Sequence, residues 1–397
     1  MTREALPART TASAEPAMSA AAVEPNQTKP KEKPAPLPGR DYPWYSPRFW
    51  HGMSLRPWLK LLAENRFRLH PARVPMAATV TTFAFTNSLW RLLQNAIHGS
   101  AIQRTEVKEP PVFILGHWRS GTTYLHELLA HDERFATPTS YQCFQPHHFL
   151  LTQPIVTKLF WWLMPSKRPQ DNVELGWNTP QEDEFALCAM GLPTPYRRMA
   201  FPNNGPVDLN YLNMQGLAAD ELQQWQDGLQ WFAKLITYHT GKRLLLKSPP
   251  HTGRAAVLCQ MFPGAKFIHL SRDPYALFPS TVKLWRALHF AQGFQLSEGD
   301  DLEEYIFTCL ETMYSDYNAD GIVHLRYEDL IADPVAHLKQ AYQTLGLDGF
   351  EQVEPKLAKY AASKRSYRPN VHKLEDTTRK AIAQRWKFYF DQFGYEF

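Results

Sequence analysis

Cysteine is scarce in this chain, and its four copies are far apart. Cys143, Cys188, Cys259 and Cys309 form no C-x-x-C pair within 397 residues. A disulfide scaffold and a zinc site are therefore not expected. Reduced, buried thiols are the simplest interpretation, and they favour a cytoplasmic protein.

Long apolar stretches are also missing. No run approaches the roughly 18 apolar residues of a membrane-spanning helix. The two nearest, 76–97 and 149–164, are interrupted by polar side chains and are expected to be core or interfacial helices. The N-terminus has no apolar segment of the kind that a secretory signal needs. We expect no transmembrane span, and peripheral contact with a membrane stays open.

Charge of one sign is not in large excess. Lys and Arg number 43 and Asp and Glu number 39, for a formal net charge of +4. So small an excess does not indicate a nucleic-acid partner, although it is compatible with an anionic ligand. Apolar residues make up 44% and charged residues 21% of the chain, which is typical of a globular protein.

The first 41 residues contain no aromatic side chain and are rich in Ala, Pro, Thr and Lys. Such a segment cannot offset its ordering entropy, so residues 1–41 are predicted to be a disordered tail. Aromatic residues become frequent at once from Tyr42 onward. We expect one domain over 42–397, with a helical extension at 42–107 and an aromatic-rich insertion at 142–242.

Strands and helices are expected to alternate along most of this domain. Apolar runs begin at 112, 244, 266 and 322, and each is followed by a segment with helical periodicity or helix-start signals. Helices are expected at 55–101, 253–261, 274–287 and 334–345. This order predicts an α/β protein with a P-loop-like, three-layer fold, in which helices cover both faces of a mostly parallel sheet.

A glycine-rich loop at 116–123 reads G-x4-G-T-T and joins an expected strand to an expected helix. Backbone N–H groups and the helix dipole make such a turn an anion site. An ATP-binding loop carries Lys where this chain has Thr122, and the cation here, Arg119, lies inside the loop. The loop therefore suits a sulfuryl group on a nucleotide better than a triphosphate. The alternative is a tight turn with a solvated Arg119.

Two further strand ends carry polar residues. Lys247 ends one strand and is followed by His251, so that Lys247 could stabilise a leaving oxygen and His251 could act as general base. Arg272 ends the next strand, and Ser280 lies two helical turns later, which suits a phosphate clamp. The alternatives are a surface Lys247 with a helix-capping His251, and a structural ion pair of Arg272.

Together these segments resemble the sulfotransferase superfamily, in the broad branch of bacterial and tyrosylprotein sulfotransferases. The resemblance covers about 108–397 and rests on four segments, at 111–135, 244–281, 324–334 and 368–397. It implies 3′-phosphoadenosine 5′-phosphosulfate (PAPS) as donor, and it implies a leaving-group role for Lys247. It also implies donor contacts from Arg119, Ser120, Gly121, Thr122 and Thr123 at the 5′-phosphosulfate, Arg272 and Ser280 at the 3′-phosphate, and Tyr327 and Arg368 elsewhere on the nucleotide.

The general base is where this chain departs from the pattern. Many members of the branch carry Glu after the second strand, whereas this chain has Gln142 near that position. An amide is a poor proton acceptor, so the base must lie elsewhere. His251 is the first candidate and the acidic run of Glu182 and Asp183 with Glu184 is the second, although such a run is often a solvated helix start. The weaker candidates are His147 and His148.

The sequence therefore predicts a metal-independent sulfotransferase that moves a sulfuryl group in line from PAPS to a hydroxyl acceptor. The acceptor class is not evident from the sequence. One alternative is a P-loop phosphotransferase for a small molecule, and another is a non-catalytic nucleotide-binding scaffold.

Overall fold

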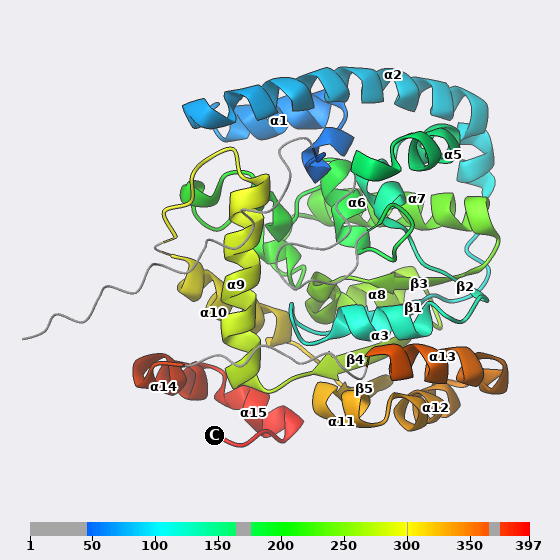
Figure 1. The fold of residues 1–397 in the computed structure, drawn as a ribbon, viewed down its shortest axis with the longest axis vertical. Coiled ribbons are helices and arrows are strands. Elements are labelled where there is room, and N and C mark those ends of the chain that lie inside the picture. The colour runs from blue at the N-terminus through cyan, green and yellow to red at the C-terminus, as the bar shows by residue number, and fades with distance from the viewer. Residues whose placement is uncertain (1–45, 164–175, 300, 365–373) are drawn as a thin grey trace, which may run out of the picture. The chain divides into compact units, whose positions relative to one another are not determined.

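A computed structural model describes residues 46–163, 176–299, 301–364 and 374–397 (Figure 1). The tail expected at 1–41 and the nucleotide contact expected at Arg368 both lie outside these described residues.

The centre of the fold is a five-stranded parallel sheet in the order β2-β3-β1-β4-β5. Ile114 of the central strand pairs with Lys247 on one side and with Ile268 on the other. The chain adds strands to both sides of β1, so the strand order reverses there, and ligands bind at the carboxyl edge of such a sheet. The strands are β1 (Val112–Leu115), β2 (Phe135–Ala136), β3 (Arg243–Lys247), β4 (Lys266–Ser271) and β5 (Ile322–Arg326).

Helices cover both faces of the sheet, because alternate strand residues point to opposite sides. Val112 and Ile114 pack against α3, α12 and α13, whereas Phe113 and Leu115 share a core with α7 and α8. The predicted α/β fold is confirmed. The helices are α1 (Leu55–Glu64), α2 (Val74–Arg104), α3 (Thr122–Leu129), α4 (Ser140–Phe144), α5 (Phe149–Leu159), α6 (Asp183–Ala189), α7 (Ala219–Thr240), α8 (Ala255–Met261), α9 (Pro274–Gln292), α10 (Leu302–Tyr314), α11 (Tyr327–Ala332), α12 (Pro334–Leu345), α13 (Phe350–Lys364), α14 (Asp376–Arg385) and α15 (Lys387–Phe393).

The helical stretch expected at 55–101 is two helices. The chain turns back after α1 through Arg66 and Phe67, both with positive φ, and Pro75 then lies in the first turn of α2. Lys266–Ser271 and Pro334–Leu345 match their expected bounds, and α9 continues past its expected end to Gln292. The helix expected at 253–261 is α8 preceded by the 3₁₀ helix η7 (Pro249–Arg254).

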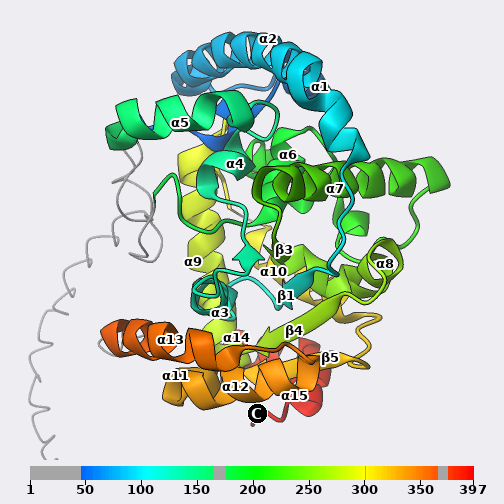
Figure 2. The same cartoon turned by 90° about the vertical axis from the view of Figure 1, so that its right-hand side faces the viewer.

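An outer layer of helices lies on the side of the fold away from α11–α13. There α2 and α5 lie next to one another in both views (Figures 1 and 2). Two side chains of α2 fix this contact. Asn87 bonds His148, with Asn87 Oδ1 3.1 Å from His148 Nε2, and Gln94 accepts a hydrogen bond from the backbone N–H of Leu150.

Two expectations about the chain as a whole can be compared with the structure. None of the described helices combines the length and the apolar character that crossing a membrane would require.

All four cysteines are free, as expected, but Cys259 is exposed. The prediction that every thiol is buried is therefore wrong for Cys259, which lies on the outer side of the short helix α8.

Candidate active site

The glycine-rich loop turns tightly between β1 and α3. Gly116, Arg119 and Gly121 all have positive φ, and Gly121 is the N-cap residue directly before α3. A Cβ at Gly116 would lie 2.5 Å from the carbonyl oxygen of Leu270, and one at Gly121 would lie 2.3 Å from the Tyr327 ring. Glycine is therefore required at both ends of the loop. The backbone amides can curl around an anion only because these contacts remain open.

Ser120 offers an unused hydrogen-bonding group inside this loop. Its side chain is fully buried, and its hydroxyl has no hydrogen-bond partner among the described residues. An orphaned buried hydroxyl is costly unless a ligand or water satisfies it. Ser120 and the adjacent α3 N-terminus, with Thr122 buried and Thr123 partly exposed, thus fit the phosphosulfate end of a donor.

The residues expected to clamp a phosphate meet beside the loop. The Nε of Arg119 donates to Ser280 Oγ at 3.0 Å, and Arg272 Nη1 donates to the carbonyl oxygen of Arg119 at 2.9 Å. The Arg272 guanidinium also stacks on Tyr327, 4.7 Å from its ring centre. Four residues from four separate segments therefore form one cationic cluster at the carboxyl edge of the sheet.

An ion pair lies at the neighbouring strand end. Lys247 Nζ lies 2.6 Å from Glu182 Oε1, with the two side chains 1% and 13% exposed. Tyr196, from the 3₁₀ helix η4 (Pro195–Met199), donates its hydroxyl proton to the other oxygen of Glu182. Burial, reinforced by the charge of Glu182, raises the pKa of Tyr196 well above its usual value, so Tyr196 remains protonated. The Glu182 carboxylate is thus held in one orientation.

A hydrogen bond joins this carboxylate to the phosphate loop. Trp118 of the loop donates its indole N–H to the Tyr196 hydroxyl at 2.8 Å. A continuous chain of contacts therefore runs from Trp118 through Tyr196 to Glu182 and Lys247. The two parts of the site are one connected network.

The acidic run 182–184, within the expected insertion, pairs in order with basic residues at and after the end of β3. Glu182 pairs with Lys247, Asp183 with His251 at 2.6 Å, and Glu184 with Arg254 at 2.6 Å. The run is therefore not a solvated helix start.

Burial separates the roles of these three pairs. The side chains of Asp183, His251, Glu184 and Arg254 are all 0% exposed. Burial opposes ionisation of Asp183, but attraction to His251 and their hydrogen bond outweigh it, so the pKa of Asp183 lies below its usual value. Of the three carboxylates at 182–184, only that of Glu182 retains access to solvent. This favours Glu182 over both His251 and Asp183 as the group that meets an acceptor.

Gln142 and the two weaker base candidates, His147 and His148, have structural contacts. Gln142 closes the first turn of α4, where its side-chain oxygen accepts the backbone N–H of Thr139 at 3.0 Å. His148 bonds Thr152 and Asn87, and burial lowers its pKa to about 4. Burial also lowers the pKa of His147, to about 3. The His147 ring lies 5.7 Å from that of Trp231.

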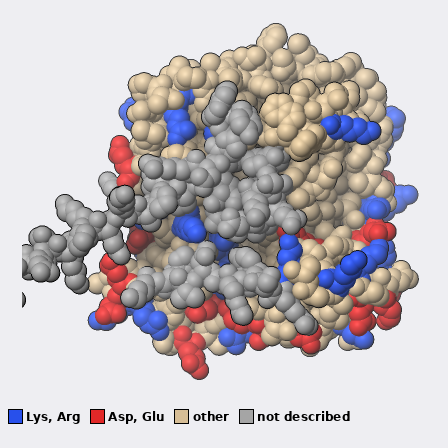
Figure 3. Space-filling model, in the orientation of Figure 1, with Lys and Arg blue, Asp and Glu red and all other residues tan. Residues whose placement is uncertain are grey.

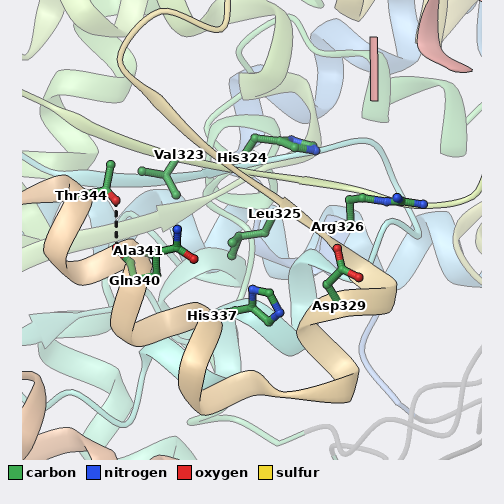
Figure 4. A pocket seen from close by; sticks show the side chains of 9 residues that line it. All are labelled: Val323, His324, Leu325, Arg326, Asp329, His337, Gln340, Ala341 and Thr344. Carbon is green, nitrogen blue, oxygen red and sulfur yellow. Dashed lines mark hydrogen bonds between the residues drawn. The ribbon is translucent and has the colours of Figure 1, made fainter. Parts of the chain in front are cut away.

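A pocket of about 290 Å³ lies elsewhere, between β5 and α12 (Figure 4). Its lining includes Asp329 and His337 but no residue of the glycine-rich loop and neither Lys247 nor Glu182. The chemistry of the site therefore does not lie in this pocket.

Sequence reasoning missed Trp118, Tyr196 and Arg254. Tyr196 and Arg254 lie 14 and 70 residues from the carboxylates that they contact, so no local spacing connects them. One signal was available for Arg254. The three consecutive acids at 182–184 are matched by three basic side chains in the eight residues 247–254.

Comparison with known proteins gives a consistent result. Residues 110–352 match the profile described as "Sulfotransferase family". Two relatives, each named Omega-hydroxy-beta-dihydromenaquinone-9 sulfotransferase Stf3, come from Mycobacterium bovis and Mycobacterium tuberculosis. Each is 39% identical over 363 residues, which span 89% of this chain and 92% of the relative.

Solved structures share the fold at low sequence identity. Sulfotransferase STF9 from Mycobacterium avium aligns with a TM-score of 0.60 and 18% identity, over 78% of this chain and 82% of that one. Sulfotransferase STF1 from Mycobacterium tuberculosis aligns with a TM-score of 0.55 and 15% identity, over 84% of this chain and 91% of that one.

Proposed function

Because this chain belongs to the sulfotransferase family, it is an enzyme that transfers a sulfuryl group to a hydroxyl, and we propose how its residues do so and on which acceptor. PAPS is the donor that the family implies. Membership favours sulfuryl transfer over the phosphotransferase and scaffold alternatives. The observation that carries the proposal is the single network joining the glycine-rich loop, the Arg272 cluster and the Lys247–Glu182 pair.

The proposed donor site lies along the carboxyl edge of β1 and β4. The loop amides, Ser120 and Thr122–Thr123 bind the 5′-phosphosulfate, which supplies the orphaned Ser120 hydroxyl with a partner. Arg272 and Ser280 bind the 3′-phosphate, and Tyr327 holds the Arg272 guanidinium flat by stacking. Arg119 links the two halves through its hydrogen bond to Ser280.

The proposed transfer uses the donor as the carrier of an activated sulfuryl group. Lys247 stabilises the charge that develops on the leaving phosphate oxygen, since its buried ammonium lies at the carboxyl end of β3, the strand that pairs with β1. Glu182 accepts the proton of the acceptor hydroxyl as that oxygen attacks sulfur. Asp183 and His251 form a fully buried pair next to Glu182 in the chain, and they do not take the proton.

We propose a metal-independent reaction. Arg119, Arg272 and Lys247 supply three positive charges at the site, which match the anionic groups of the donor without a divalent ion. The free cysteines, three of them buried, support a cytoplasmic enzyme.

The proposed acceptor is the terminal hydroxyl of a long, apolar isoprenoid quinone. The two relatives at 39% identity are named for such a substrate. Aromatic rings also lie beside Tyr196, the residue whose hydroxyl bonds Glu182. The Phe185 ring lies 5.2 Å from that of Tyr196, and it also lies 5.8 Å from Phe144 and 5.5 Å from Phe49. These rings suit an apolar chain better than a sugar or a charged peptide.

The test is transfer of labelled sulfur from PAPS to four compounds, measured with and without EDTA: an ω-hydroxylated menaquinone, the same quinone without the hydroxyl, a phenol and a tyrosine peptide. An ω-hydroxylated menaquinone is expected to be labelled, and the same quinone without the hydroxyl is not. Labelling of only a phenol or a tyrosine peptide would overturn the acceptor. Loss of transfer in EDTA, restored by magnesium, would overturn the metal-independent reaction.

A further inference from the structure

The helix α2 exposes most of its large apolar side chains. Most of its buried residues are small or polar, and only Val80 and Ile102 are larger apolar side chains; the others are Ala77, Ala84, Asn87 and Gln94. Its exposed large apolar residues are Val74, Phe83, Phe85, Leu89, Trp90, Leu92, Leu93 and Ile97. A helix that packs on a core and meets water on its other side has the opposite pattern. The outer face of α2 is therefore expected to contact another apolar surface.

The adjacent segment extends the same surface. Beyond α5, the 3₁₀ helix η3 (Trp161–Leu163) leaves Trp161 70% exposed, and Leu159 is 64% exposed. Ile155, Phe160 and Trp162 are exposed as well. Most of the exposed large apolar side chains among the described residues lie on these two segments. We call this surface the α2–α5 face; clusters of this kind mark interaction sites.

The charge of the α2–α5 face has one sign. Neither 74–104 nor 149–163 contains an acidic residue, and their charged residues are Arg91, Arg104 and Lys158. Figure 3 shows the surface over this end largely free of charge apart from a few basic side chains, while acidic side chains gather mainly toward the other end. Apolar residues with Trp and scattered Lys and Arg are the composition of a surface that lies in a membrane interface.

We propose that the α2–α5 face docks on the surface of a lipid bilayer containing anionic phospholipid. The helix α2 has 31 residues and is therefore about 46 Å long, so it can lie flat across many headgroups. Its apolar side chains enter the acyl boundary, and Arg91 and Lys158 meet lipid phosphates. A second copy of the chain would instead set these basic residues against one another, with no acidic residue on the face to pair them.

Docking goes beyond the proposed function but agrees with it. The helix η1 (Phe49–Gly52) and α4 lie between α2 and α6, where Phe49 and Phe144 contact Phe185. Apolar contacts therefore connect α2 with Phe185, the residue that directly follows the acidic run 182–184. A quinone with a long isoprenoid chain resides in the bilayer, so docking would bring the enzyme to its acceptor.

The experiment is flotation of the purified full chain with vesicles that contain neither donor nor acceptor. One set is phosphatidylcholine, and the other has a third of it replaced by phosphatidylglycerol. We expect flotation with the anionic set and weaker flotation with the neutral set. The double variant Leu92→Glu/Leu159→Glu should lower partitioning at least tenfold, because each Leu loses its apolar burial. The variant Trp161→Ala/Trp162→Ala should also lower it.

The matched control is Leu296→Glu/Ile331→Glu, which changes exposed apolar residues outside the α2–α5 face. It should float like the wild type, and all variants should keep the wild-type melting temperature because their side chains are exposed. Failure of the wild type to float, or equal loss in the control, would overturn docking. So would a stable dimer that the Leu92→Glu/Leu159→Glu variant converts to monomers. Because the vesicles hold no substrate, none of these outcomes bears on sulfuryl transfer.

Discussion

The Nζ of Lys247 lies 2.6 Å from Oε1 of Glu182, in a pair whose lysine is almost fully buried. Each charge offsets the other in a region where an isolated charge would be costly, so removing one partner of such a pair costs about 3–5 kcal/mol. Variants at either position therefore combine a chemical effect with a stability effect. Isosteric replacements and a melting measurement separate the two.

Glu182→Gln should slow the chemical step by about 10²–10⁴-fold, because the amide cannot accept the acceptor's proton. Donor affinity should stay within a few-fold of the wild type. Single-turnover transfer and titration calorimetry with 3′-phosphoadenosine 5′-phosphate (PAP) measure the two quantities. His251→Asn should instead lower the melting temperature, because the buried carboxylate of Asp183 loses its charged partner. A folded His251→Asn variant that loses transfer while Glu182→Gln retains it would reverse the assignment.

Lys247→Met should abolish transfer and leave PAP binding mostly intact, because the ammonium acts on charge that develops in the transition state. The matched control is Lys266→Met, a lysine at the amino end of β4 rather than at the carboxyl edge. The control should retain wild-type turnover. If Lys247→Met lost PAP affinity and transfer to the same degree, Lys247 would be a binding residue.

Arg272→Ala should weaken binding of PAP about ten- to a hundredfold, the value of a charge-assisted contact. Binding of adenosine 5′-phosphosulfate, which lacks the 3′-phosphate, should change much less. Ser280→Ala should show the same selectivity with a smaller effect. Equal losses for both ligands would mean that Arg272 acts only by supporting the Arg119 carbonyl.

Stability should fall as the pH decreases from 7 to 5. Burial lowers the pKa of His117 to about 3 and that of His148 to about 4, whereas an unfolded histidine titrates near 6.5. The unfolded state therefore binds more protons between these values, and each such histidine costs about 2 kcal/mol of stability by pH 5. The measurement is the free energy of unfolding in urea at both pH values.

His148→Gln should make this pH dependence shallower by roughly one proton, since a glutamine does not titrate. The expected difference between wild type and variant grows as the pH falls below 6.5. An unchanged slope would show that His148 is already protonated in the folded protein.

The sequence predicted the parts of the site that depend on local chain geometry. The loop at 116–123 and the residues that end β3 and β4 were found because a parallel strand delivers its last residues to one edge. Glu182 was harder to rank against His251, because burial decides between them and burial depends on contacts 65 to 70 residues apart. The exposed apolar face of α2 could not be predicted either, since periodicity alone does not say which side of a helix packs against the core.

The bond from Trp118 to Tyr196 has a consequence for how substitutions combine. Trp118 belongs to the donor loop, and Tyr196 orients the carboxylate at the acceptor side. Residues that share one network do not contribute independently, so a double-mutant cycle of Trp118→Phe and Tyr196→Phe should depart from additivity. Donor and acceptor preferences of this enzyme would then be altered together, and an attempt to re-engineer one would have to re-optimise the other.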